Sequence, residues 1–169
     1  MLVVSGLPGT GKSAVAAALA TRLGAAHLSV DPIEVALLRA GLTPSRETGV
    51  AAYEAARAVA EGDLAVGLTV VVDAVNDSEP ARETWRAAAS RSGVRLVPVL
   101  LTLADHAEHR RRLEGRVRAL THVPEPSWDQ VQARGASYAP WAEGTCVRVD
   151  AGPPVEQVVL DVLERLPQS

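Results

Sequence analysis

The chain has 169 residues, of which 47% are apolar, and this length and composition predict a single domain over residues 1–169 with a real hydrophobic core. Its net charge of −3 and pI near 5.8 exclude a strong overall basic field, which disfavours a protein whose main task is gripping long nucleic acid. The one cysteine, Cys146, cannot form an intramolecular disulfide, which is typical of a reducing compartment. The chain starts directly with an apolar strand, and its apolar runs stay short of the ~20 residues that a bilayer demands, so we expect a cytoplasmic protein without a membrane partner.

A glycine-rich loop follows the first predicted strand. Leu2–Ser5 is a short apolar strand, and Ser13–Leu23 is a helix that Gly24 ends as a C-cap. Between them lies Gly6-Leu7-Pro8-Gly9-Thr10-Gly11-Lys12-Ser13, which fits the phosphate-binding pattern G-x-x-x-x-G-K-[ST] in full. Lys12 is the only lysine in a chain that otherwise uses arginine. Strand, loop and helix therefore come in the order that this kind of site requires.

This loop has the properties of a site for the phosphates of ATP. Its glycines let consecutive N–H groups, together with the positive end of the helix, point at one phosphate chain. Lys12 can reach the β- and γ-phosphates, and the Ser13 hydroxyl can bind Mg²⁺. We therefore predict ATP and Mg²⁺ as ligands, and a turn that binds nothing is the disfavoured alternative. The predicted nucleotide contacts in the loop are Gly9, Thr10, Gly11, Lys12 and Ser13.

The second predicted strand, His27–Val30, is followed by an acid. Asp31-Pro32 opens the next helix. If the strand belongs to the same parallel sheet, Asp31 faces the γ-phosphate side of the ligand crevice and can accept the proton of an attacking hydroxyl group. The alternative is that Asp31 is the N-cap of the helix, and the two roles are compatible.

The segment 41–67 is predicted to form a helix that covers one side of the substrate site. Tyr53 and Arg57 share a face of this helix. Both residues can enter the acceptor pocket, and an exposed helix face is the equal alternative.

A second acid ends the third predicted strand, Leu68–Val72. Asp73 follows this apolar run in the form of a Walker B element, and the carboxyl ends of parallel strands line the ligand crevice. Asp73 is therefore predicted to hold Mg²⁺ together with Ser13. The alternative is that Asp73 caps the helix that begins near Ser78.

Arginines dominate the helix after the fourth predicted strand, Arg95–Leu101. Arg112 and Arg116 lie one turn apart on one face, and Leu113 gives the helix an apolar side to dock. We predict a lid over about residues 106–126 in which both arginines neutralise the phosphates and help to expel water. A solvated helix face is the alternative reading of each arginine. His106, His109 and His122 lie near this lid without the partners that a zinc site needs.

The last predicted strand is Cys146–Val149, and Pro153-Pro154 opens a final helix that runs to about Leu166. Five strands that alternate with helices predict an α/β fold with a mostly parallel sheet.

The motifs, taken together, resemble those of a known family. In chain order they are Gly-x-Pro-Gly-x-Gly-Lys-Ser, Ser29-x-Asp31, Val71-Val72-Asp73-Ala74-x-Asn76, Arg112-Leu113-x-x-Arg116, Ser127, Gln132 and Val149-Asp150. This set is similar to the small P-loop kinases of the zeta-toxin, polynucleotide-kinase and chloramphenicol-phosphotransferase group. The resemblance implies a P-loop NTPase three-layer sandwich, with a five-stranded sheet in the order 2-3-1-4-5 and helices on both faces. It also implies that Asp31 is the catalytic base, that Arg112 and Arg116 bind the ATP phosphates, and that the loop from Asp150 to Pro153 lies beside the adenine.

Two departures from the family pattern narrow the acceptor. Many relatives that act on phosphorylated substrates have an arginine where this chain has Glu34, and a carboxylate there would repel a substrate phosphate. Where relatives often have threonine, this chain has Val75, which leaves Asn76 as the polar contact on that turn. The expected acidic set favours a neutral or cationic acceptor such as an amino sugar or a hydroxylated antibiotic. That set is Asp31, Glu34, Asp73 and Asp77.

Three functions remain open from the sequence. The leading one is an ATP-dependent kinase of a hydroxyl group on a small molecule. A polynucleotide or nucleoside kinase comes second, because it predicts a basic groove that the sequence does not obviously supply. A non-catalytic nucleotide-binding switch or toxin-like module is the third, although the N-K-x-D motif of GTPases is excluded when Lys12 is the only lysine.

Overall fold

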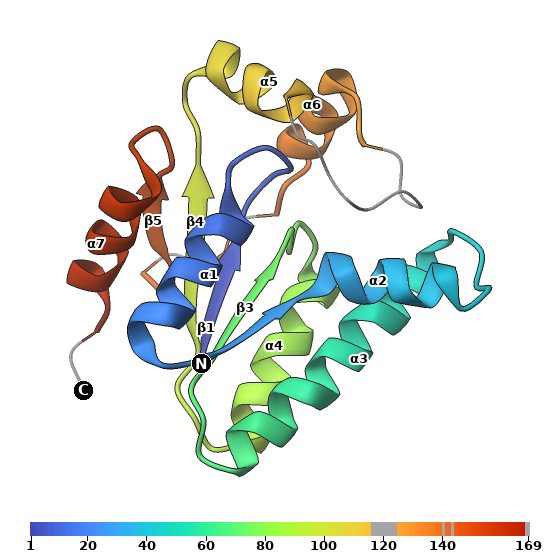
Figure 1. The fold of residues 1–169 in the computed structure, drawn as a ribbon, viewed down its shortest axis with the longest axis vertical. Helices are drawn as coiled ribbons and strands as arrows, with labels where there is room; N and C mark the ends of the chain where they lie inside the picture. Colours follow the sequence, from blue (N-terminus) through green and yellow to red (C-terminus); the bar gives the residue numbers. More distant parts are fainter. Residues whose placement is uncertain (116–124, 140, 143, 168–169) are drawn as a thin grey trace.

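Five parallel strands form a sheet in the computed structural model, which describes residues 1–115, 125–139, 141–142 and 144–167 (Figure 1). The strands are β1 (Leu2–Ser5), β2 (Ala26–Ser29), β3 (Val70–Ala74), β4 (Val97–Thr102) and β5 (Val147–Asp150). Their order across the sheet is β2-β3-β1-β4-β5, and each neighbouring pair is parallel. The fold class and the strand order expected from the sequence are confirmed.

Helices cover both faces of this sheet. They are α1 (Lys12–Leu23), α2 (Val30–Arg39), α3 (Arg46–Ala65), α4 (Glu79–Arg91), α5 (His106–Glu114), α6 (Trp128–Ala136) and α7 (Val155–Arg165). One core holds side chains of α1 and α7, and a second core holds those of α3 and α4. None of the described helices combines the length and the apolar content that a membrane crossing requires.

The central strands are apolar on both sides because each side faces one of these cores. Val3 and Val4 are neighbours in β1, both fully buried, yet Val3 packs in the core of α3 and α4 while Val4 packs in the core of α1 and α7. Alternate side chains of a strand point to opposite faces, so a buried parallel strand needs an unbroken apolar run. The sheet thereby holds the loop after β1 in a fixed position.

The helix predicted in the segment 41–67 begins only at Arg46. The strand bounds differ from the sequence prediction by at most two residues, and one of these differences affects the site. β3 continues to Ala74, because Asp73 and Ala74 still pair with Val4 and Ser5 of β1. Asp73 therefore lies within the ladder, not after it. At the C-terminal end of α1, Gly24 takes the left-handed conformation with φ 58°, as expected for a C-cap glycine.

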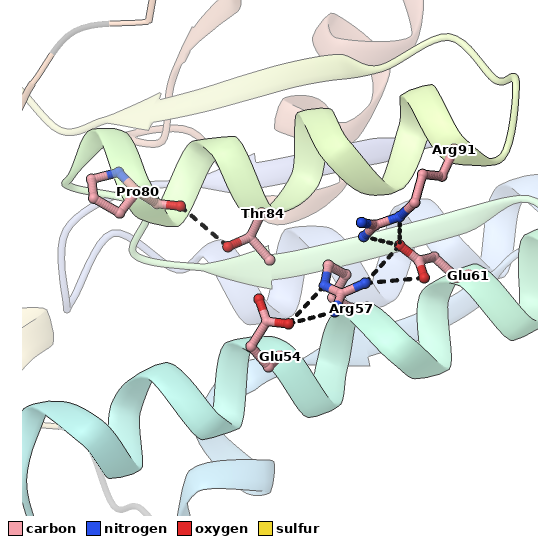
Figure 2. A network of polar contacts seen from close by, with 6 residues as sticks. All are labelled: Glu54, Arg57, Glu61, Pro80, Thr84 and Arg91. Atoms are coloured by element: carbon pink, nitrogen blue, oxygen red, sulfur yellow. Dashed lines mark hydrogen bonds and ion pairs between the residues drawn. The ribbon is translucent and has the colours of Figure 1, made fainter.

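A network of ion pairs joins α3 to α4 (Figure 2). The guanidinium of Arg57 donates to Glu54 and, on the next turn, to Glu61 at 3.0 Å. Arg91 of α4 donates to the same Glu61 at 2.9 Å. Arg57 is thus paired with two acids of its own helix, one of which also pairs with α4, and these contacts favour the helix-face alternative over a place in the acceptor pocket.

Helices α5 and α6 lie together beyond the ends of β1 and β4, on the side of the glycine-rich loop (Figure 1). Residues 106–115 and 125–126 of the predicted lid are described, whereas Arg116 and residues 117–124 lie outside the described residues. The part of the lid next to the loop can therefore be placed.

Candidate active site

The glycine-rich loop wraps the start of α1. The helix begins at Lys12, and Gly11 before it has φ 85°, a conformation that glycine adopts without strain. Thr10 closes the loop, because its hydroxyl and its N–H both donate to the carbonyl oxygen of Leu7, at 2.9 and 3.3 Å. Lys12 and Thr10 are each only 2% exposed. The loop N–H groups and the positive end of the α1 dipole therefore meet at one place, as an anion-binding loop requires.

The two residues predicted to hold a metal are in contact. Ser13 Oγ donates a hydrogen bond of 2.8 Å to Asp73 Oδ1, across 60 positions of sequence. β1 and β3 are neighbours in register Val4 to Asp73, so the acid lies beside the loop that leaves β1. The helix after β3 has Ser78 at its N-cap, and the alternative in which Asp73 caps that helix is wrong. A hydroxyl and a carboxylate are the hard oxygen donors that Mg²⁺ prefers, and this pair fits that ion.

A histidine that the sequence analysis missed binds the other oxygen of this carboxylate. His27 Nε2 lies 2.9 Å from Asp73 Oδ2, and Asp73 is 1% exposed. β2 pairs with β3 in register Ser29 to Asp73, and side chains two residues apart share a face of the sheet. His27 and Asp73 therefore point the same way. The sequence shows a histidine in the second strand, but its contact with Asp73 follows only from the pairing register of β2 with β3.

Asp31 lies in the first turn of α2, directly after the end of β2. The N-cap position of this helix is Ser29, so Asp31 is inside the helix and the N-cap alternative for it is wrong. β2 and β3 are neighbours, which brings Asp31 to the same edge of the sheet as Asp73. A carboxylate in the first turn is also favoured by the helix dipole. The position suits a base beside the γ-phosphate, and that role stays a prediction.

The first lid arginine contacts a different loop in this structure. Arg112 donates to the carbonyl oxygens of Ala151 and Gly152 at 2.6 and 2.9 Å, and to Glu108 at 2.6 Å. Hydrogen bonds from Arg111 and then Arg112 lower the pKa of Glu108 to about 2. Leu113 is 4% exposed, which confirms the apolar docking side of the helix. Binding of phosphate by Arg112 would require it to exchange these partners.

Asp150 shapes the loop that Arg112 binds. It is the last residue of β5, and its Oδ1 accepts a hydrogen bond of 3.2 Å from the N–H of Gly152. The carbonyl groups of that turn face Arg112. The start of the loop predicted to lie beside the adenine is therefore joined both to β5, through Asp150, and to α5, through Arg112.

Comparison with known proteins gives the family. Residues 1–137 match the family described as AAA domain. The chain belongs to this AAA-domain family. Similar structures include a gluconokinase from Sinorhizobium meliloti 1021 at 23% identity, which aligns over 96% of this chain and 89% of that chain with a TM-score of 0.67. No curated protein matches the sequence significantly.

Two other solved structures are similar to this AAA-domain chain. A sugar kinase from Janibacter sp. HTCC2649 has 17% identity and a TM-score of 0.74, over 98% of this chain and 92% of that chain. The APS kinase of Mycobacterium tuberculosis, in complex with AMPPNP and APS, has 20% identity and a TM-score of 0.68, over 96% of this chain and 95% of that chain. At these identities the likeness shows a shared fold. The resemblance to small P-loop kinases is confirmed.

Two acids of the set that was expected beside the acceptor are paired with other side chains in this AAA-domain protein. Asp77 forms an ion pair with Arg134 of α6 at 2.8 Å, a partner that the sequence did not indicate. Asp73 is taken by Ser13 and His27. Of the acidic set, Glu34 lies near Asp31, and burial first, then the charge of Asp31, raises its pKa, while Arg134 opposes the shift.

Asn76 is a structural residue and not an acceptor contact, which corrects the sequence prediction. It is fully buried, and it has φ 55°, a rare conformation outside glycine. Its amide nitrogen donates to Ser5 Oγ at 3.0 Å, and its amide oxygen accepts from Trp85 Nε1 at 2.8 Å. Its backbone N–H donates to the hydroxyl of Tyr53 at 3.2 Å. The side chain joins β1 to α4 and has no surface left for a ligand.

Proposed function

We propose that the protein is an ATP-dependent kinase that transfers the γ-phosphate to a hydroxyl group of a small molecule. The observation that carries this proposal is the 2.8 Å hydrogen bond between Ser13 Oγ and Asp73 Oδ1. It joins the residue after Lys12 to the acid of the neighbouring strand, and P-loop enzymes use this pair of donors around Mg²⁺. Two of the similar structures are a gluconokinase and a sugar kinase, which supports a small-molecule acceptor.

Each step of the transfer has a candidate residue. The N–H groups of residues 9–13 and the ammonium group of Lys12 hold the phosphates of ATP. Asp31 orients the acceptor hydroxyl and takes its proton as the new P–O bond forms and the bond to ADP breaks. Arg112 and Arg116 close over the charge that develops on the transferred group. Ser13 and Asp73 would hold Mg²⁺, which supplies charge neutralisation to the phosphates when it is bound.

Glu34 supports a neutral or cationic acceptor. Its carboxyl group lies beside the proposed base, and its raised pKa reflects burial and the negative charge of Asp31. A negative charge on the acceptor would add to the repulsion between Glu34 and Asp31, whereas an ammonium group on the acceptor would relieve it. Glu34→Gln should therefore weaken cationic acceptors and improve anionic ones, each by a few-fold. If an anionic acceptor is preferred and Glu34→Gln makes no difference, this acceptor class is wrong.

The test of the proposed function is transfer of label from γ-labelled ATP. The acceptors are pooled amino sugars, hydroxylated antibiotics, nucleosides and 5′-hydroxyl oligonucleotides, and Asp31→Asn is measured beside the wild type. Label in a small molecule that is lost in Asp31→Asn, with ATP binding retained, is the expected result. Label in an oligonucleotide or a nucleoside would favour the second function, and full activity of Asp31→Asn would overturn the base assignment.

A further inference from the structure

The glycine-rich loop is held from outside by a histidine of α5. His109 is 5% exposed, and its Nε2 lies 2.8 Å from the carbonyl oxygen of Pro8, 101 positions earlier in the chain. A carbonyl oxygen can only accept a hydrogen bond, so Nε2 carries the proton and donates it. This contact joins a lid helix to the main chain of the loop that is predicted to bind phosphate.

The hydrogen bond to the Pro8 carbonyl oxygen also fixes the direction of the next N–H group, that of Gly9. The peptide between Pro8 and Gly9 is trans, and the C=O and N–H of a trans peptide point in opposite directions. Because His109 holds the Pro8 carbonyl oxygen toward α5, the N–H of Gly9 points away from α5. In an anion-binding loop the N–H groups provide the affinity, and their direction decides whether they reach one ligand.

The packing around His109 allows little freedom for this peptide. Gly9 has φ 91°, and a Cβ atom built on it would lie 3.0 Å from His109 Cδ2 and 3.2 Å from Leu113 Cβ. On the other side, the ring of Trp128 meets the His109 ring edge-on, with 5.2 Å between centroids. His109 is therefore clamped between α6 and the loop, and the loop cannot turn the Pro8–Gly9 peptide without breaking the hydrogen bond.

We propose that His109 is a positioning residue that presets the Gly9 N–H for binding of the nucleotide phosphates. The inference rests on the nucleotide-binding part of the proposed function and not on phosphoryl transfer. It predicts that loss of the His109 hydrogen bond lowers the affinity for ligands that carry the phosphate chain and leaves the affinity for the nucleoside unchanged.

The test compares two amide substitutions by calorimetry. The side-chain nitrogen of Gln can take the place of His Nε2, whereas the Asn side chain is one bond shorter and cannot reach Pro8. His109→Asn should weaken ATP and inorganic tripolyphosphate by about 10- to 100-fold, since a hydrogen bond to a charged group is lost or misdirected. His109→Gln should remain within about 3-fold of the wild type. Adenosine should bind equally to all three proteins.

His106 provides a matched control on the same helix. It is exposed, and it also meets Trp128 edge-on, at 6.2 Å, so His106→Asn removes an aromatic contact while the hydrogen bond from His109 to Pro8 stays in place. This variant should bind tripolyphosphate as the wild type does. The proposal is overturned if His109→Asn binds tripolyphosphate normally, if it loses adenosine and tripolyphosphate equally, or if His109→Gln is no better than His109→Asn. Because the experiment measures only binding, it still tests the role of His109 if the protein proves to have no kinase activity.

Discussion

The glycine-rich loop is supported differently on its two sides. On the sheet side, defined by Ser13, His27 and Asp73, side chains from α1, β2 and β3 bind one another. On the lid side, defined by His109 and Arg112, side chains of α5 bind main-chain carbonyl groups of two loops. The sheet side therefore positions the side chains that are predicted to bind the metal, and the lid side positions the main chain of two loops. Substitutions on the sheet side should change metal binding and transfer, whereas those on the lid side should change how tightly the nucleotide is held.

The largest effect is expected at Lys12, the buried first residue of α1. Lys12→Ala removes the ammonium group that is predicted to reach the transferred phosphate, in a site where the side chain is 2% exposed. We expect the rate of transfer to fall by on the order of 10³-fold or more. The measurement is label transfer under saturating ATP, with Arg22→Ala at the exposed end of the same helix as the control. Retained activity would remove the loop from the catalytic mechanism.

The next largest effect is expected at Asn76, and it concerns the stability of the fold, not the binding of a ligand. Asn76→Ala leaves the fully buried indole N–H of Trp85 without its partner and removes the hydrogen bond to Ser5 Oγ. It also places alanine at φ 55°. We expect the free energy of unfolding to fall by about 3 kcal/mol, measured by urea denaturation. Thr84→Ala, which loses one exposed hydrogen bond within α4 (Figure 2), should change it by less than about 0.5 kcal/mol.

His27 tests whether the sheet side acts on the metal. His27→Ala frees Asp73 Oδ2 from its 2.9 Å contact, and partners of this kind typically contribute 10- to 100-fold to metal affinity. We expect the gain in ATP affinity on adding Mg²⁺ to shrink by about 10-fold, while metal-free ATP binding stays unchanged. His27→Gln should recover part of the loss. In an Asp73→Asn background the same substitution should have no further effect on Mg²⁺ dependence, and an undiminished effect there would contradict a role through Asp73.

The contrast between the two sides also explains which parts of the site the sequence could predict. Ser13 and Asp73 were predictable, because the loop pattern places Ser13 directly after Lys12 and because Asp73 directly follows the apolar run Val70–Val72. Strand ends in a parallel sheet gather at one edge, so local patterns are enough to bring them together. His27 needed the pairing register of β2 with β3, which a single strand pattern does not contain.

Contacts of the lid side depend on packing over long distances in sequence. His109 looks like any helical histidine until α5 is placed on Pro8, and Arg112 looks like its neighbours in an arginine-rich helix until it meets Ala151. Main-chain carbonyl groups carry no residue identity, so no motif marks them as partners. Asn76 failed as a predicted ligand contact for a related reason: a polar residue on a turn reads as exposed until Trp85 is packed over it. The pairing of Asp77 with Arg134 was hidden in the same way.

The smallest expected effect compares Glu34, which lies near the proposed base Asp31, with Glu108 of the lid side, by the response of each acid to pH. Burial, and then Asp31, raises the pKa of Glu34 above the usual 4.5. A group with a raised folded pKa stabilises the protein fully below the unfolded pKa, and this contribution is lost as the pH rises through the folded value. Glu34→Gln mimics the protonated form, so it should raise Tm at pH 7 by about 1–2 °C and leave Tm unchanged below about pH 4.

Glu108 on the lid helix should show the opposite sign. Its pKa is lowered to about 2 by Arg111 and then Arg112, so its contribution is present above the usual pKa of 4.5 and is lost as the pH falls toward 2. Glu108→Gln should therefore lower Tm at pH 7, and the difference from the wild type should shrink under acid conditions. Thermal melts of both variants across pH 3–8 measure the two signs in one experiment. The negative charge of Glu34 is repelled by its neighbour Asp31, whereas that of Glu108 is compensated by two arginines. If both substitutions shift Tm in the same direction at pH 7, this difference in electrostatic surroundings does not control the stability of the two variants.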